Sequence, residues 1–338
     1  MILKINNREF DYFNAVSVSM SYDKIASTFN FVAHFDPDNP SHRSLFQPLK
    51  YSTVEILHEG ETLLIGRKVT TSFTSNSTPQ LAQIGGYSLT GVFEDSNIPL
   101  SVYPIQSDGL TLRQIAEKIL KPFDIAVVVD SIVADDVDSV LESSDASTTG
   151  TVKSYLTSLA TQKNVILSHT KSGALLFTRA KANQAPIADL SEAVDKKLSV
   201  SGQGIHSSIA VFKDANIVGG NAGENELDNP LVTSFRPSVS VQSSGDDNDT
   251  ELTAKLRRAA ELKSIKLTIK LDSWMINGKV IRPNRIISVK DKSLHLYKRT
   301  NWFIEAVTLS GNEKEQTATL KCVLPEVYTN QTPSNPFS

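Results

Sequence analysis

The segment from Glu251 to Tyr328 constrains the fold of this chain more than any other part of it. It opens with apolar residues that recur every three or four positions, which predicts a short amphipathic helix ending near residues 259–261. Strand-like alternation and turns follow, over residues 265–269, at Asn277-Gly278, and in a hairpin over 302–309 and 316–324. A helix leading into paired antiparallel strands predicts a small β-barrel. Nothing in the segment indicates catalysis, so we expect its function to lie in assembly.

Length and composition point to a folded protein of more than one domain. The 338 residues suggest two or three domains, and the 40% hydrophobic and 21% charged fractions are ordinary for a folded chain. A formal net charge of −3 does not favour a nucleic-acid-binding protein. The single cysteine, Cys322, cannot form an internal disulfide, and its alternation with apolar neighbours predicts a buried structural thiol.

No segment of the sequence suggests membrane insertion or export. No apolar run approaches the ~18 residues that a membrane helix needs. The first six residues, Met1 to Asn6, lack the basic start and long apolar core of a signal peptide and suggest a first strand instead. The sequence therefore predicts no membrane partner and folding in the cytoplasm of a host.

Residues 1–100 are predicted to form an N-terminal, tube-like β-barrel. Strict alternation over residues 16–20 and 28–35 predicts two strands, and Asp36-Pro-Asp-Asn-Pro40 has the composition of a turn. Two hairpins are expected, and their strands cover residues 54–58, 62–65, 69–75 and 80–89.

Residues 101–195 change to a pattern that predicts an α+β insert. Apolar residues on one face predict a helix over 112–120, which begins after Thr111 and ends at Pro122, and a second helix over about 152–162. Strand patterns cover residues 125–129, 165–169 and 174–178, the last two as a hairpin.

Residues 196–325 return to strands and are predicted to form a second β-barrel with a short helix. Strands are expected over 198–200 and 208–213, and loops over 219–230 and 243–249; residues 326–338 are expected to form an extended C-terminal tail. The predicted fold class is therefore α+β, mainly β, with two small antiparallel β-barrels flanking an α+β insert.

Candidate catalytic and metal-binding residues do not form a convincing site. The six histidines (34, 42, 58, 169, 206 and 295) have no metal-ligand spacing. Glu94-Asp95 is a weak match to a glycosidase pair, and Asp246, Asp247 and Asp249 are a weak match to a calcium loop whose glycine and closing glutamate are misplaced. We expect no cofactor, no metal and no enzyme activity.

Charge is distributed unevenly along the chain. Residues 122–152 contain no lysine or arginine but seven acidic residues, whereas residues 255–299 contain thirteen basic residues and three acidic ones. The candidate charged interface consists of basic residues of this second stretch: Lys263, Lys266, Lys279, Arg282 and Arg285. Such a surface would orient an acidic partner more than it would add affinity, and the alternative is two solvated faces that differ in charge. A basic lumen could also contact DNA nonspecifically.

Three stretches occur in an order that is typical of one family of phage proteins. They are residues 86–91 (GYSLTG) with Asp95 and the helix over 112–120; residues 151–160 (TVKSYLTSLA) with the hairpin to Arg179; and Trp274, Gly278, Pro283-Asn284 and Val289. Together they resemble the baseplate hub proteins of Mu-like, contractile-tailed bacteriophages. Ile281 departs from the family, in which an aromatic residue is common at this position.

The resemblance implies a structural virion protein of the tail baseplate. It implies a homotrimeric hub that joins the hexameric tail tube to the trimeric central spike and contacts other baseplate proteins, with DNA passing through its lumen. Three alternatives stay open: a tail-associated cell-wall hydrolase, a carbohydrate-binding adhesin, and the spike component of a related contractile injection system.

Overall fold

The computed structural model describes residues 1–10, 13–75, 80–103, 109–141, 150–193, 195–212, 226–241, 250–312 and 314–338. The aspartates at 246, 247 and 249 lie outside these residues. The chain divides into two compact units. Unit 1 contains Met1–Thr178, Leu271–Pro283 and Ala306–Thr319, and unit 2 contains Arg179–Lys270, Asn284–Glu305 and Leu320–Ser338.

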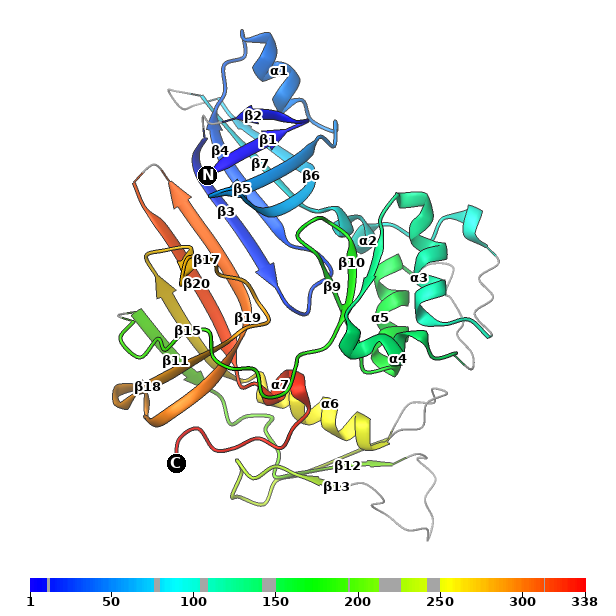
Figure 1. The fold of residues 1–338 in the computed structure, drawn as a ribbon, viewed down its shortest axis with the longest axis vertical. Coiled ribbons are helices and arrows are strands. Elements are labelled where there is room, and N and C mark those ends of the chain that lie inside the picture. Colours follow the sequence, from blue (N-terminus) through cyan, green and yellow to red (C-terminus); the bar gives the residue numbers. More distant parts are fainter. Residues whose placement is uncertain are drawn as a thin grey trace. The chain divides into compact units, whose positions relative to one another are not determined.

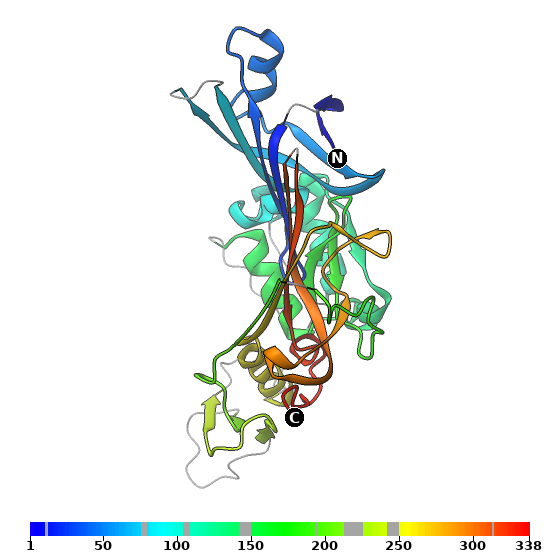
Figure 2. The same ribbon diagram turned by 90° about the vertical axis from the view of Figure 1, so that its left-hand side faces the viewer.

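An antiparallel sheet forms the N-terminal part of unit 1 (Figure 1). Its strands are β1 (Ile2–Ile5), β2 (Arg8–Phe10), β3 (Phe13–Ser21), β4 (Thr28–His34), β5 (Thr53–His58), β6 (Glu61–Thr74) and β7 (Leu81–Ser88). Their hydrogen-bonded order is β3-β4-β7-β6-β5-β1-β2, and β3 also pairs with residues 306–312 of β19 (Leu296–Asn312). Figure 2 shows β3 and β19 side by side from a second direction.

The period-two pattern of these strands has its expected cause. In β3, Val16, Val18 and Met20 are buried, while Ser17 and Ser19 occupy the opposite face and are half-buried. The predicted break between residues 65 and 69 is wrong, because β6 runs without interruption from Glu61 to Thr74. A register shift between Lys68 and Thr70 accommodates this length, since an extra residue lets a long strand bend within its ladder.

A short helix, α1 (Pro40–Phe46), follows β4 where the sequence suggested only a turn. The Asn39 side chain accepts hydrogen bonds from the backbone N–H groups of Ser41 and His42, and Pro40 occupies the first helical turn. The same asparagine and proline that mark a turn therefore also start a helix.

The α+β insert of unit 1 confirms the predicted helices. Its elements are α2 (Val92–Asp95), α3 (Leu112–Leu120), β8 (Val127–Val129), α4 (Ala134–Asp138), α5 (Val152–Gln162), β9 (Ile166–His169) and β10 (Leu175–Thr178). Thr111 and Gln114 form a reciprocal capping box at the start of α3. The sheet order is β8-β10-β9, and the apolar faces of α3 and α5 share one core with it.

Two short strands complete unit 1, β16 (Met275–Ile276) and β17 (Lys279–Val280). They pair across Asn277-Gly278, and both turn residues have a positive φ, as such a tight turn requires. The predicted turn is confirmed.

Unit 2 contains the remaining elements: β11 (Asp195–Val200), β12 (Ser208–Phe212), β13 (Glu226–Asp228), β14 (Pro237–Val241), α6 (Thr250–Leu262), β15 (Ile265–Leu271), β18 (Ile286–Asp291), β20 (Gln316–Val323) and α7 (Glu326–Thr329), with β15, β19 and β20 extending into unit 1. Strand β12 lies between β13 and β14, and α6 covers this small sheet through Ala254, which packs with Ile209 and Val211. Two expectations are wrong here: the loop predicted over 219–230 contains β13, and the tail predicted as extended starts with the turn of helix α7.

The fold class is α+β and mainly β, with a large antiparallel sheet, as predicted. Among the described residues the strands pair in an open order, so closure into two barrels stays a prediction. The domain limits at residues 100, 195 and 325 also stay predictions. No helix of the described residues is long and apolar enough to cross a membrane.

Candidate interaction surfaces and the Arg282 cluster

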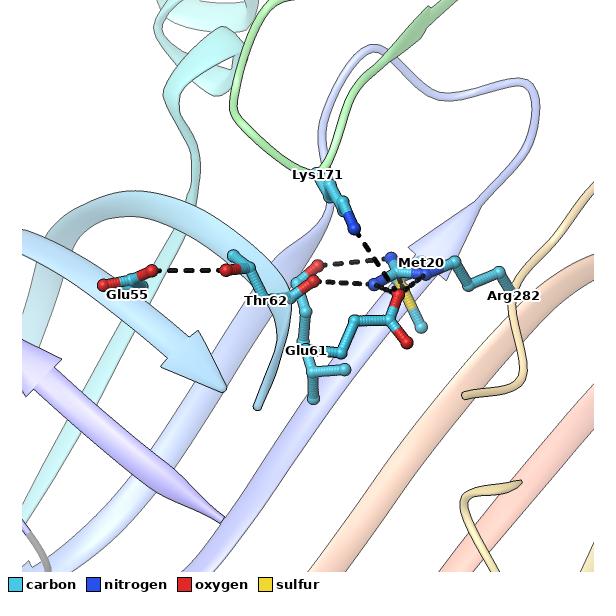
Figure 3. A network of polar contacts seen from close by, with 7 residues as sticks. Met20, Glu55, Glu61, Thr62, Lys171 and Arg282 are labelled. Carbon is cyan, nitrogen blue, oxygen red and sulfur yellow. Dashed lines mark hydrogen bonds and ion pairs between the residues drawn. The ribbon is translucent and has the colours of Figure 1, made fainter. Parts of the chain in front are cut away.

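A cluster of polar contacts surrounds Arg282 in unit 1 (Figure 3). Its guanidinium donates to Oε1 of Glu61 from Nε at 3.3 Å and from Nη2 at 3.1 Å. Nη2 also donates to the Thr62 carbonyl at 2.7 Å, and Nη1 donates to the Leu63 carbonyl at 3.4 Å. Lys171, in the turn between β9 and β10, lies 3.7 Å from the same carboxylate oxygen. The cluster therefore connects β6, the insert and the 271–283 segment within one unit.

The 271–283 segment is also held by an apolar contact. Trp274 is 1% exposed, and its Nε1–H donates to the carbonyls of Ser310 and Thr317 at 2.9 and 3.1 Å. Its ring lies 5.0 Å from that of His58. Ile281, where the family commonly has an aromatic residue, is buried as well. Trp274 and Ile281 thus bury apolar side chains of the same segment that Arg282 binds to β6.

A second polar network joins the insert to the N-terminal sheet. His169, at the end of β9, has Nε2 at 2.6 Å from the Ser27 hydroxyl and Nδ1 at 3.3 Å from the Lys24 carbonyl. A carbonyl only accepts, so Nδ1 carries the proton and Nε2 accepts from Ser27. The Ser27 N–H in turn donates to the buried Ser88 hydroxyl at 3.1 Å. Burial lowers the pKa of His169 to about 4, so the ring is neutral near pH 7.

The predicted charged residues fall into both units. Lys263 lies 3.5 Å from Glu305 and over the Tyr328 ring, 4.9 Å from its centroid. Lys266 and Arg285 are exposed in unit 2, and Lys279 is exposed on β17 in unit 1. Arg282 belongs to unit 1, where its donors are used by the cluster described above. Lys266, Lys279 and Arg285 are therefore the members whose side chains are exposed on the surface of their unit.

The carboxylates suggested as a glycosidase pair have structural partners. Lys153 donates to Glu94 at 2.8 Å, and the Tyr87 hydroxyl donates to Asp95 at 3.3 Å. Within the described ranges no three His, Cys, Asp or Glu side chains gather in a way that could hold a metal ion. Cys322 is 1% exposed, and burial raises the pKa of its thiol.

Sequence analysis missed Glu61, Lys171 and Lys68. The first two are 221 and 111 positions away from Arg282, so no local pattern marks them. Lys68 did leave a signal: it continues the inward-facing alternation of residues 64 and 66 on β6, where a lysine is unusual.

Comparison with known proteins shows which proteins this chain resembles. Residues 98–179 match the family model of the second domain of gp44-like baseplate hub proteins. The chain also has the fold of the 43 kDa tail protein of prophage MuSo2 from Shewanella oneidensis. The TM-score is 0.80 at 19% identity, over 97% of this chain and 99% of that one. A tail protein of Neisseria meningitidis MC58 is similar, with a TM-score of 0.78 at 18% identity over 98% of both chains.

The fold also occurs in a secretion system. The E. coli c3393 protein, described as a component of the type VI secretion system, has a TM-score of 0.60 at 13% identity and covers 98% of this chain. No curated protein matches the sequence. The resemblance to baseplate hub proteins of Mu-like phages is confirmed. The matched proteins are described as a baseplate hub domain, tail proteins and a secretion-system component.

Proposed function

We propose that this chain is the trimeric hub of a contractile-tail baseplate and joins the hexameric tail tube to the trimeric central spike. The observation that carries the proposal is the match of residues 98–179 to the hub's second domain within a fold shared over 97% of the chain with a Mu-type prophage tail protein. The proposed domains are residues 1–100, 101–195 and 196–325, followed by the tail.

The physical argument is one of symmetry. A trimer in which each subunit contributes two similar β-rich domains presents six similar surfaces on one side while remaining threefold on the other. Residues 1–100 and 196–325 would supply these two domains, each closing with its neighbours into a barrel-like ring. A ring built from one kind of subunit would therefore match both a sixfold tube and a threefold spike.

Charge would orient these contacts. We propose that Lys266, Lys279 and Arg285, with Lys263 at the margin, face acidic surfaces of the spike, the tube or other baseplate proteins. Exposed pairs of this kind govern encounter and orientation more than affinity and weaken as salt increases. DNA passing through the ring would be contacted without sequence specificity.

The first test is the mass of the purified protein by light scattering at low and moderate salt, with negative-stain images of the same sample. A threefold ring with an open centre is the expected result. Addition of the cognate spike protein is a second arm, because some hubs could trimerise only on their spike. A chain that stays monomeric in both arms contradicts the proposal.

A second candidate is the corresponding part of a contractile injection system, which the similarity to the c3393 protein favours. Mass spectrometry of purified particles separates the two. Phage particles that contain this chain together with capsid and genome support the hub of a virion, whereas headless particles support an injection system.

A further inference from the structure

The loop between α1 and β5, residues 47–52, is held firmly at both of its ends. The buried Lys68 side chain donates to the carbonyls of Leu45 and Gln47 at 3.0 and 2.7 Å. The backbone N–H of Lys68 donates to the Ser52 carbonyl at 2.9 Å. Burial lowers the pKa of Lys68, and the positive charge of Lys50 lowers it further. An unusual buried lysine therefore fixes the ends of an otherwise exposed loop.

The tip of this loop displays two apolar side chains on a strained backbone. Leu49 is 79% exposed with φ +59°, and Tyr51 is 49% exposed with φ +50°. Residues other than glycine and asparagine rarely adopt this left-handed backbone conformation, which persists only where the surrounding structure imposes it. At this exposure neither side chain contributes substantially to the hydrophobic core. We call this feature the Leu49–Tyr51 tip.

The surroundings of the tip are basic. Arg43, Lys50 and Arg67 are exposed, and Arg67 is paired with Thr53 across the first residues of β5. Residues 39–54 contain no aspartate or glutamate. The nearest acidic residues in sequence are Glu55, which is half-buried on β5, and Asp38, before α1. An apolar tip with this rim fits an apolar surface bordered by carboxylates.

Unit 1 has such a surface on its insert. Strand β8 is an edge strand of the β8-β10-β9 sheet, and Val128 in its middle is 39% exposed. Asp124 and Asp135 flank it and are exposed, and Asp130 is half-buried. An open strand edge of this kind is available for contact with another chain. We call these four residues, Asp124, Val128, Asp130 and Asp135, the acidic edge.

We propose that the Leu49–Tyr51 tip of one copy docks on the acidic edge of a second copy. Both surfaces belong to unit 1, and Figure 1 shows α1, which precedes the tip, and α4, which carries Asp135, at opposite ends of that unit. A contact between two different patches of identical subunits is heterologous, and a series of such contacts closes into a ring when the rotation permits. The proposal rests on the trimeric hub proposed above and names the surfaces that would join its subunits.

Charge reversal tests the proposal on the full chain. The double variant Arg43→Glu/Lys50→Glu and the double variant Asp124→Lys/Asp135→Lys should each weaken assembly at least about tenfold, measured by light scattering over a concentration series. The quadruple variant restores opposite signs and should recover assembly to within about threefold of the wild type. Lys181→Glu/Lys298→Glu, two exposed lysines of unit 2, is the matched control and should leave the assembly constant unchanged.

Leu49→Asn separates association from folding. Asparagine tolerates a positive φ better than leucine, so the Tm of the monomeric fraction should be equal or higher. Loss of the apolar tip should nevertheless weaken association about tenfold. A wild-type trimer that keeps its assembly constant in Leu49→Asn and in both double variants overturns this inference and leaves the hub standing. A wild type that stays monomeric with and without its spike overturns both.

Discussion

Two cations bind parts of unit 1 to the same strand, β6, in chemically different ways. Arg282 reaches β6 from the 271–283 segment and finds both a carboxylate, Glu61, and two carbonyls. Lys68 starts from β6 and donates to the carbonyls of Leu45 and Gln47, and no carboxylate pairs with it among the residues that the structure describes. The arginine is 24% exposed in its side chain, whereas the lysine is 2% exposed as a residue. We therefore expect the partly exposed Arg282, which has a carboxylate beside it, to cost little free energy, and the buried Lys68, which is held by carbonyls, to cost more.

The largest expected effect tests whether Arg282 or Trp274 contributes more to the stability of the 271–283 segment. Trp274→Ala removes a fully buried ring and two hydrogen bonds, so the free energy of unfolding should fall by about 3–5 kcal/mol. Urea unfolding followed by circular dichroism measures it. A loss below about 1 kcal/mol would assign the segment to Arg282 instead.

The next effect concerns pH. The pKa of His169 is lowered to about 4 in the folded chain, against about 6.5 in the unfolded chain, so the unfolded state binds the proton first. Stability supplied by the neutral ring is complete above about pH 6.5 and is lost as the pH falls toward 4, by at most about 3 kcal/mol. In His169→Gln this part of the acid sensitivity should vanish. Equal pH profiles for the two proteins would contradict the assignment.

Removal of each cation sharpens the comparison directly. Arg282→Met leaves Glu61 with Lys171 as its remaining cation and two carbonyls without donors, and should cost about 1–3 kcal/mol. Lys68→Met also leaves two carbonyls unpaired but buries an apolar side chain of similar length, so its cost should be smaller, about 1 kcal/mol. Thermal unfolding of both variants gives the order, and a larger loss in Lys68→Met would reverse the conclusion.

The smallest effect supplies the reference for an exposed ion pair. Arg113 and Asp138 form a bidentate pair on the surface of the insert at 2.7 and 2.8 Å. Arg113→Met should cost roughly 0.2–1 kcal/mol, and the loss should shrink at high salt. A cost equal to that of Arg282→Met at high salt would show that partial burial does not distinguish the two arginines.

The sequence predicted those elements whose cause is local. Helix α3 was found from end to end because its apolar spacing and the Thr111 cap are both written within ten residues. Strand β6 was divided in the prediction because the bulge between Lys68 and Thr70 interrupts the alternation without ending the strand. Helix α1 was missed because Asn39-Pro40 serves equally as a turn and as a helix start.

The candidate surface was harder to predict than the fold. A run of basic residues indicates charge but not which cations are already used inside the protein. Arg282 is bound by groups more than 200 positions away, and only the tertiary structure brings them together. Lys266, Lys279 and Arg285 are exposed, and the charged interface that they were predicted to form stays a prediction.

The lone buried thiol of Cys322 has a practical consequence for anyone following this protein through assembly. A reagent reacts with it only when unit 2 opens locally, because the side chain is 1% exposed and burial also disfavours the reactive thiolate. Because the chain contains one cysteine, the labelling rate reports local opening at that single position. A slower labelling rate after ring formation would measure how far the ring suppresses local opening of unit 2, without an engineered probe.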